Sequence, residues 1–134
     1  MHFQYFEWIK DIVKTAIEDV FIVDPYLNEE VLIKFCVYAK TGVGIRLLGE
    51  SYMSTLQPAA EALNKQRGGA VSLRKSSGLH DRYIFIDRSR CFISGASFKD
   101  DPQISASHLA EVIDAAAELL ALPEAAWTKA AARL

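Results

Sequence analysis

The sequence predicts an α/β fold in a single domain spanning residues 1–134. Short β-prone apolar runs alternate with amphipathic helical segments, which favours a mixed, mainly parallel sheet flanked by helices on both faces. The composition, 51% hydrophobic and 24% charged, is typical of a packed globular protein. The two cysteines lie in apolar runs without a CxxC pattern, so neither a disulfide framework nor a zinc site is indicated. The length fits a complete protein and equally one domain of a longer protein.

The first third of the chain predicts a helix, a strand and a second helix. Apolar residues recur at helical spacing over residues 3–17. The continuous apolar run 20–23 ends before Pro25, and such a run is typical of a central strand that is covered on both faces. Asn28 is a suitable N-cap for a helix that extends to about Lys40.

The middle of the chain continues the alternation. Residues 45–48 and 71–74 read as strands, and the segment 55–66 between them reads as a helix. The next two β-prone runs, 83–87 and 91–94, are separated only by a short polar turn, which predicts a hairpin.

Two helices are expected at the C-terminal end. Ser107 can cap a helix that runs to about Leu120. Pro123 suits the first turn of a last helix that ends near Arg133.

Charge is distributed unevenly along the chain. The net charge is −2, but residues 64–99 hold 8 Lys or Arg against 2 Asp or Glu. This basic stretch predicts a groove that attracts a polyanion such as nucleic acid, with a solvated surface as the alternative. The groove would be lined by Arg67, Arg74, Lys75, Arg88, Arg90 and Lys99. No apolar run approaches the roughly 18–20 residues of a membrane span, so we expect a cytoplasmic protein without membrane contact.

The segment from Leu79 to Asp87 carries the candidate chemistry. It places His80 two residues before Arg82, next to a predicted strand. Because side chains alternate along a strand, His80 and Arg82 are expected on one face and Asp87 on the other. A histidine beside a fixed cation suits an anionic substrate, whereas Asp87 is expected to have a structural role.

This segment resembles the signature of the phospholipase D superfamily, which reads His-x-Lys, four residues, Asp, six residues, Gly-Ser-x-Asn. Six residues after Asp87, the run Ser94-Gly95-Ala96-Ser97 stands where Gly-Ser-x-Asn is expected. Arg82 replaces the lysine, Ser94-Gly95 inverts the Gly-Ser order, and Ser97 replaces the asparagine. The chain is also similar to divergent single-motif members found in bacterial defence and mobile-element proteins, and its Asp24-Pro25-Tyr26 run is similar to the exit of an earlier strand in the superfamily.

The resemblance implies a metal-independent phosphodiesterase without a cofactor, most readily a nuclease. In that superfamily two motifs meet: one histidine forms a phosphohistidine and the other protonates the leaving oxygen. This chain carries one motif, so it is expected to form one half-site, completed in a homodimer. His80 would be the nucleophile, and Arg82 would neutralise charge that develops on the phosphoryl oxygens.

The remaining site residues follow from the same resemblance. Ser97 and Lys99 join Arg82 as expected phosphate ligands, and Gly95 joins Asp87 as a structural residue of the motif. Glu111, on the helix predicted after the motif, is the expected carboxylate that orients His80, with Asp114 as second choice.

Two other functions stay open at this point. The replacement at Ser97 favours a catalytically weakened module that binds phosphate or nucleic acid through Arg82 and Lys99. Lipid headgroup chemistry is the least favoured reading, because the sequence has no basic amphipathic helix with an exposed aromatic face.

Overall fold

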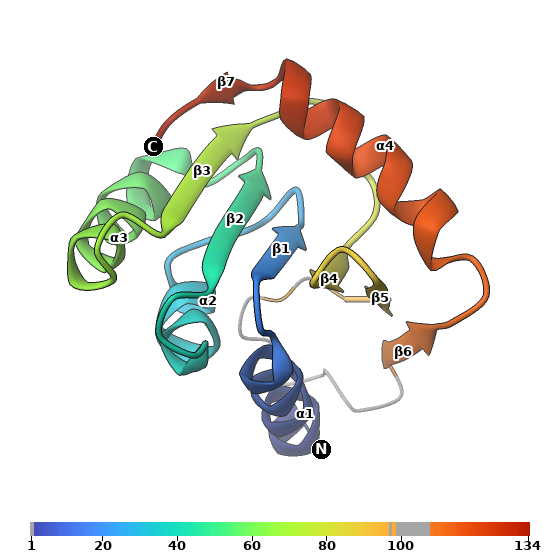
Figure 1. Ribbon diagram of the computed structural model, residues 1–134. Helices are drawn as coiled ribbons and strands as arrows, with labels where there is room; N and C mark the ends of the chain where they lie inside the picture. Colours follow the sequence, from blue (N-terminus) through green and yellow to red (C-terminus); the bar gives the residue numbers. More distant parts are fainter. Residues whose placement is uncertain (1, 97, 99–107) are drawn as a thin grey trace.

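Seven strands form one mixed sheet in the order β6-β5-β4-β1-β2-β3-β7 in the computed structural model (Figure 1). The structure describes residues 2–96, 98 and 108–134. The strands are β1 (Asp19–Val23), β2 (Gly44–Gly49), β3 (Val71–Lys75), β4 (Tyr83–Ile86), β5 (Arg90–Ser94), β6 (Leu109–Val112) and β7 (Ala131–Ala132). The helices are α1 (His2–Thr15), α2 (Glu30–Lys34), the 3₁₀ helix η1 (Cys36–Tyr38), α3 (Met53–Gln66) and α4 (Ala116–Lys129). None of the described helices is both long and apolar enough to cross a bilayer.

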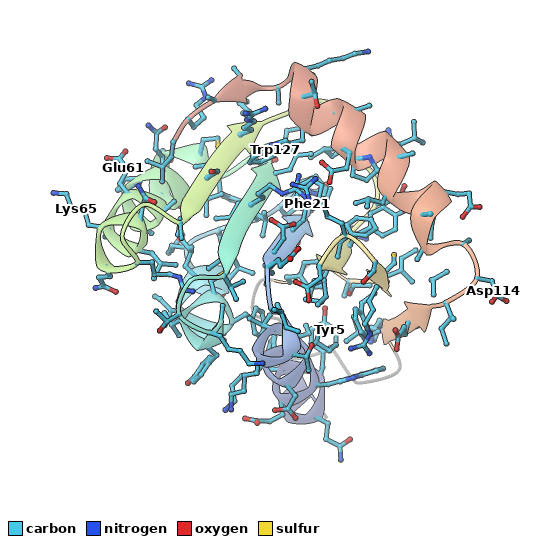
Figure 2. The ribbon with its side chains drawn as sticks, viewed as in Figure 1. Tyr5, Phe21, Glu61, Lys65, Asp114 and Trp127 are labelled. Atoms are coloured by element: carbon cyan, nitrogen blue, oxygen red, sulfur yellow. The ribbon has the colours of Figure 1, made fainter. Side chains whose placement is uncertain are left out.

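Helices cover both faces of the sheet, as predicted (Figures 1 and 2). Helices α1, α2 and α3 pack on one face, where Tyr5 and Leu47 are completely buried. Helix α4 packs on the other face, where its Trp127 contacts Phe21 of β1 edge-on with ring centroids 5.5 Å apart. The sheet is therefore the middle layer of three.

The central strand is β1, as its continuous apolar sequence predicts. It pairs parallel with β2 and antiparallel with β4, and residues 20–23 are buried. Parallel pairing is confined to β1, β2 and β3, while β4, β5, β6 and β7 pair antiparallel. The α/β class and the mixed sheet are confirmed, whereas the expectation of a mainly parallel sheet is wrong, because most pairings among the described strands are antiparallel.

The predicted hairpin is formed by β4 and β5. Both residues between Ile86 and Ser89 have positive φ, 54° at Asp87 and 55° at Arg88, and the Ser89 N–H donates to the Ile86 carbonyl at 3.0 Å. Two central residues with positive φ define a type I′ turn, whose twist matches the flanking strands. Neither residue is glycine, and the turn is supported by contacts that Asp87 makes elsewhere.

The helix predicted over residues 28–40 is interrupted. It begins one residue later than expected, with Glu29 instead of Asn28 as N-cap, although the Asn28 side-chain oxygen accepts from the Glu30 N–H at 3.1 Å. Helix α2 ends at Lys34, Phe35 leaves the helical region with φ −126°, and η1 follows. Phe35 is completely buried, so packing of its ring in the core outweighs the local preference of residues 28–40 for a continuous helix.

The helix predicted from Ser107 to Leu120 is wrong. Residues 109–112 form β6, which pairs with β5 from Cys91 to Ser94. Pairing with β6 gives the backbone groups at the edge of β5 hydrogen-bond partners. These hydrogen bonds between distant segments outweigh the local helical preference of residues 109–112. A single helix, α4, then replaces the two predicted ones and holds Pro123 in its interior.

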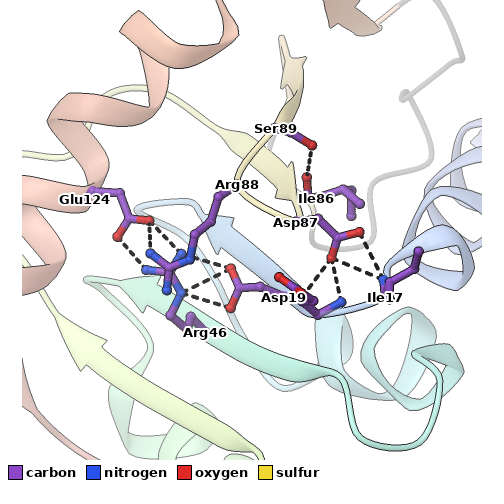
Figure 3. Close-up of polar contacts among 9 residues, drawn as sticks. Ile17, Asp19, Arg46, Ile86, Asp87, Arg88, Ser89 and Glu124 are labelled. Carbon is purple, nitrogen blue, oxygen red and sulfur yellow. Dashed lines mark hydrogen bonds and ion pairs between the residues drawn. The ribbon is translucent and has the colours of Figure 1, made fainter.

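A buried arginine joins α4 to the sheet (Figure 3). The Arg46 guanidinium on β2 donates to Asp19 at 2.9–3.3 Å and to both carboxylate oxygens of Glu124 on α4 at 2.6 and 2.8 Å. It also lies 4.1 Å from the centroid of the Phe21 ring. Burial alone would lower the pKa of Arg46, but its hydrogen bonds with Glu124 and Asp19 raise it. The exposed Arg88 makes a second contact with Glu124, at 2.9 Å.

Asp87 fastens the hairpin turn to the loop between α1 and β1. Its carboxylate accepts from the backbone N–H groups of Ile17, Glu18 and Asp19 at 2.7–3.1 Å (Figure 3). Burial raises the pKa of Asp87, but these N–H donors outweigh it and hold the pKa below its usual value. Asp87 therefore lies at the end of β4 that is farther from His80.

We expect Asp87→Asn to lower the free energy of unfolding by about 1 kcal/mol at neutral pH, because a neutral amide accepts these hydrogen bonds less strongly. Asparagine tolerates positive φ, so the turn itself is retained. A carboxylate with a lowered folded-state pKa stabilises above its unfolded pKa of about 3.9 and loses that contribution as pH falls through the folded-state pKa. Urea unfolding of both proteins should show a difference in the free energy of unfolding at pH 7 that disappears below about pH 4. A difference that does not change with pH would contradict the role of the Asp87 charge.

Candidate active site

One end of the sheet gathers the polar residues of the motif. The carboxyl ends of β1, β2 and β3 lie at the same end as the start of β4, because β4 runs antiparallel to β1 and pairs Tyr83 with Val23. The loop that enters β4 is held there by the Leu79 N–H, which donates to the Glu50 carboxylate at 3.2 Å. His80 and Arg82 therefore stand beside the strand ends, where α/β proteins commonly bind ligands.

A pocket of about 260 Å³ opens at this end between the loop and α4. His80 is exposed and forms part of its wall. Two carboxylates, Asp81 and Glu118, share the pocket with His80. Burial raises the pKa of Tyr83, and the nearby Asp81 carboxylate raises it further. The lining residues are Val23, Ser76, Ser77, Gly78, Leu79, His80, Asp81, Tyr83, Glu118, Leu119, Leu122, Pro123 and Ala126.

Arg82 is directed to the face of the sheet that α1 covers, as are Ile84 and Ile86 of β4. His80 instead lines the pocket on the α4 side, so the expectation that the two side chains share one face is not met. The Arg82 carbonyl accepts from the Ser94 N–H at 2.9 Å, which extends the pairing of β4 with β5. The Arg82 Nε is buried and has no hydrogen-bond partner among the residues that the structure describes. A buried guanidinium nitrogen without a partner is costly, so this side chain is suited to receive an anion.

A buried hydrogen-bond chain lies beside Arg82. The Tyr5 hydroxyl of α1 is 2.7 Å from the Ser94 Oγ, and Ser94 Oγ donates to the Ala96 carbonyl at 2.6 Å. Burial raises the pKa of Tyr5 to about 12; the Ser94 hydrogen bond and Arg82 lower it, while Asp24 raises it. Asp24 is completely buried at the end of β1 and accepts from the Phe98 N–H at 2.8 Å. These contacts position the turn that follows β5.

We expect Ser94→Ala to lower the free energy of unfolding by about 1–3 kcal/mol, because it leaves the buried Tyr5 hydroxyl without this partner. In a Tyr5→Phe background the same change should cost about 1 kcal/mol less, since no hydroxyl is then left unpaired. Denaturant unfolding of the four proteins in this double-mutant cycle measures the difference. Equal costs in both backgrounds would show that the Tyr5–Ser94 hydrogen bond contributes nothing.

The structure places Glu111 away from His80. Glu111 lies on β6, opposite Phe92, and its carboxylate accepts from Arg90 at 3.0 and 3.1 Å. Arg90 pairs with Ile86, at the end of β4 that is farther from His80. The expectation that Glu111 orients His80 depended on a helix that is not formed, and Asp114 lies in the exposed turn after β6 (Figure 2).

Two expected phosphate ligands, Ser97 and Lys99, lie outside the described residues. The expected structural residue Gly95 is described, and its N–H donates to the His108 carbonyl at 2.7 Å. It thus joins β5 to the start of β6, next to Ser94.

The basic stretch does not form the expected groove. Arg67 donates to carbonyls of the loop before β2, and Arg74 donates to the Trp127 carbonyl at 2.6 Å. Arg88 and Arg90 are paired with Glu124 and Glu111. These four side chains are therefore used in contacts within the chain.

Lys75 instead lines a hollow that adjoins the pocket. This second hollow, of about 470 Å³, also contains Lys129 of α4 and shares Ser76 and Ser77 with the pocket beside His80. Both lysines are exposed, and neither forms an ion pair within the part of the chain that the structure describes. The free positive charge at this end of the sheet thus lies next to the pocket.

Sequence reasoning missed the contribution of α4 and of the loop after β3. Glu118 and Lys129 lie far from His80 in the sequence, and neither they nor the nearby Ser76 belong to a motif, so no spacing signal was available for them. Among the described residues, no group of three or more His, Cys, Asp or Glu side chains is placed to hold a metal ion.

Comparison with solved structures identifies the fold. The chain superposes on Nuc, a phospholipase D family member from Salmonella typhimurium, with a TM-score of 0.64 over 94% of this chain and 88% of Nuc, at 13% identity. NucT from Helicobacter pylori gives 0.66 over 98% of this chain and 92% of NucT, at 12% identity. The chain has the phospholipase D fold.

The chain also superposes on part of TrmBL2, an archaeal chromatin protein described as having a novel mode of DNA binding. The TM-score is 0.57 over 96% of this chain and 49% of TrmBL2, at 14% identity. No protein-family model and no curated protein matches the sequence. The similarity is therefore seen in the three-dimensional structure.

Proposed function

We propose that this chain is a metal-independent phosphodiesterase that cleaves nucleic acid, with His80 as nucleophile. The observation that carries the proposal is the placement of an exposed His80 in a pocket wall, two residues from Arg82, whose buried Nε has no described partner. This pair occurs at the end of the sheet in a phospholipase D fold. A nucleophile two residues from a guanidinium that has an unpartnered nitrogen suits attack on a phosphodiester.

The reaction would proceed in two displacements. A ring nitrogen of His80 attacks phosphorus, a P–N bond forms, and the P–O bond to the leaving group breaks. Arg82 neutralises charge on the non-bridging oxygens during this step. The leaving oxygen takes a proton from a second imidazole, and water deprotonated by that imidazole then attacks phosphorus and breaks the P–N bond.

The second imidazole is proposed to be the partner's His80. A two-fold axis through the site brings two identical half-sites together, so that one chain supplies the nucleophile and the other the acid. The exposure of His80 is compatible with this arrangement, because the ring is accessible to a second chain.

Nucleic acid is the proposed substrate because of the free cations beside the pocket. Lys75 and Lys129 line the adjoining hollow, and both are available to contact phosphates next to the one that is cleaved. The DNA-binding description of TrmBL2, which has the same fold, supports this substrate class.

A phosphate-binding module without turnover is the second candidate. It is favoured by Ser94, whose hydroxyl is committed to Tyr5 and Ala96, and by Ser97 in place of the signature asparagine. The fold is shared with a chromatin protein, so use in DNA binding has a precedent.

The test is cleavage of end-labelled single- and double-stranded DNA and RNA in excess EDTA. The proposal predicts turnover, and a labelled protein adduct that is stable in base and lost in acid when the reaction is stopped early. Binding without cleavage of any of the four substrates, lost on Arg82→Ala, would favour the binding module instead.

A further inference from the structure

We infer that the pocket beside His80 receives one unstacked nucleobase, preferably one with an exocyclic amino group, so that the preferred substrate is single-stranded. This inference rests on the proposed function, since it assigns the part of the substrate next to the cleaved phosphate. It concerns Glu118 and the apolar wall of α4, which the cleavage step does not use.

The walls of the pocket suit a flat apolar ring. Leu119, Pro123 and Ala126 contribute from α4, and Val23 and Tyr83 contribute from the ends of β1 and β4. A volume of about 260 Å³ is just below the roughly 300–1,000 Å³ of pockets that hold drug-sized ligands. The space therefore fits one ring system.

The polar groups of the pocket disfavour a phosphate and favour an N–H donor. Glu118 and Asp81 are carboxylates, and the pocket wall includes neither lysine nor arginine. Carboxylates accept hydrogen bonds from the amino groups of bases, as Glu and Asp do from cytosine N4. Cytosine, adenine and guanine carry such a group, whereas uracil and thymine do not.

The surrounding charges place phosphates on both sides of this pocket. His80 in the pocket wall marks the cleaved phosphate, and Lys75 and Lys129 in the adjoining hollow mark a neighbouring one. A nucleotide chain has this alternation of phosphate, base and phosphate. A base paired and stacked in a duplex cannot enter the pocket without leaving its partner, which selects single strands.

The test uses a set of single-stranded oligonucleotides, each with one abasic residue at a different position, so that every possible cleavage position is covered. Their cleavage is compared with that of intact cytosine strands and intact thymine strands. In EDTA, the intact cytosine strand should be cleaved at least about tenfold faster than the abasic strand, as expected from the loss of one base contact. The cytosine strand should also be preferred to the thymine strand. Equal cleavage of intact and abasic strands would overturn the inference, whereas no cleavage of either strand would count against the proposed function itself.

Substitutions in α4 test whether the preference for intact over abasic strands depends on the pocket. Ala126→Phe fills the pocket and should bring the intact-to-abasic ratio toward one, while Ala117→Phe, an exposed position on the same helix outside the pocket wall, should keep the wild-type ratio. If Ala126→Phe does not fold, Glu118→Gln serves instead and should reduce the preference for cytosine over thymine. Turnover of phosphatidylcholine vesicles that is lost in either pocket variant would overturn the inference by assigning the pocket to a lipid headgroup.

Discussion

Replacing His80 by alanine is expected to reduce metal-free cleavage of nucleic acid by at least about 10³-fold and to leave the thermal midpoint unchanged. The loss is large because the side chain is proposed to form the covalent bond to phosphorus. The midpoint should be retained because His80 is exposed in a loop before β4. Initial rates in EDTA and thermal unfolding of both proteins measure the two effects.

Chemical rescue separates the nucleophile from a structural contribution. His80→Gly leaves a space that added imidazole can occupy, so imidazole should restore part of the activity of this variant but not of Arg82→Ala. Undiminished cleavage by His80→Ala would exclude His80 as the nucleophile and point to a different reacting group.

Mixing wild-type and His80→Ala chains tests whether two copies share one site. If subunits exchange and each site needs two histidines, activity should fall with the square of the wild-type fraction. A linear fall would show that each chain is active by itself.

Replacing Arg46 by alanine is expected to lower the free energy of unfolding by about 3 kcal/mol, the largest stability effect that we predict. The guanidinium is almost completely buried and contacts Asp19 and Glu124 together (Figure 3). Its removal leaves the partly buried Asp19 and Glu124 carboxylates facing one another, with only the exposed Arg88 as counter-charge to Glu124, and breaking a buried pair typically costs about 3–5 kcal/mol. Chemical denaturation at neutral pH measures this change.

Arg88→Ala is the matched control, because Arg88 contacts the same Glu124 but its side chain is 58% exposed. Exposed ion pairs contribute at most about 1 kcal/mol, so this variant should remain close to wild type. Similar losses for Arg46→Ala and Arg88→Ala would indicate that burial does not decide the difference. Because α4 also forms the pocket, Arg46→Ala should reduce the base preference along with stability.

Local patterns predicted much of the sheet. The run 20–23 reads as a central strand because four consecutive apolar residues need cover on both faces, and β1 has that cover. The hairpin follows from two β-prone runs with a short polar turn between them. His80 and Arg82 were located by spacing within one loop and strand, where sequence distance and spatial distance are nearly the same.

Contacts between distant segments were decided only by the tertiary structure. Residues 109–112 form a strand because β5 presents an unpaired edge, a fact that their own sequence does not contain. The same pairing carries Glu111 to Arg90 and away from His80. Glu118 reaches the pocket because Arg46 and Trp127 hold α4 against the sheet. Short-range preferences are thus encoded in neighbouring residues, whereas the pocket depends on the burial of charge and apolar area between segments that are far apart in the chain.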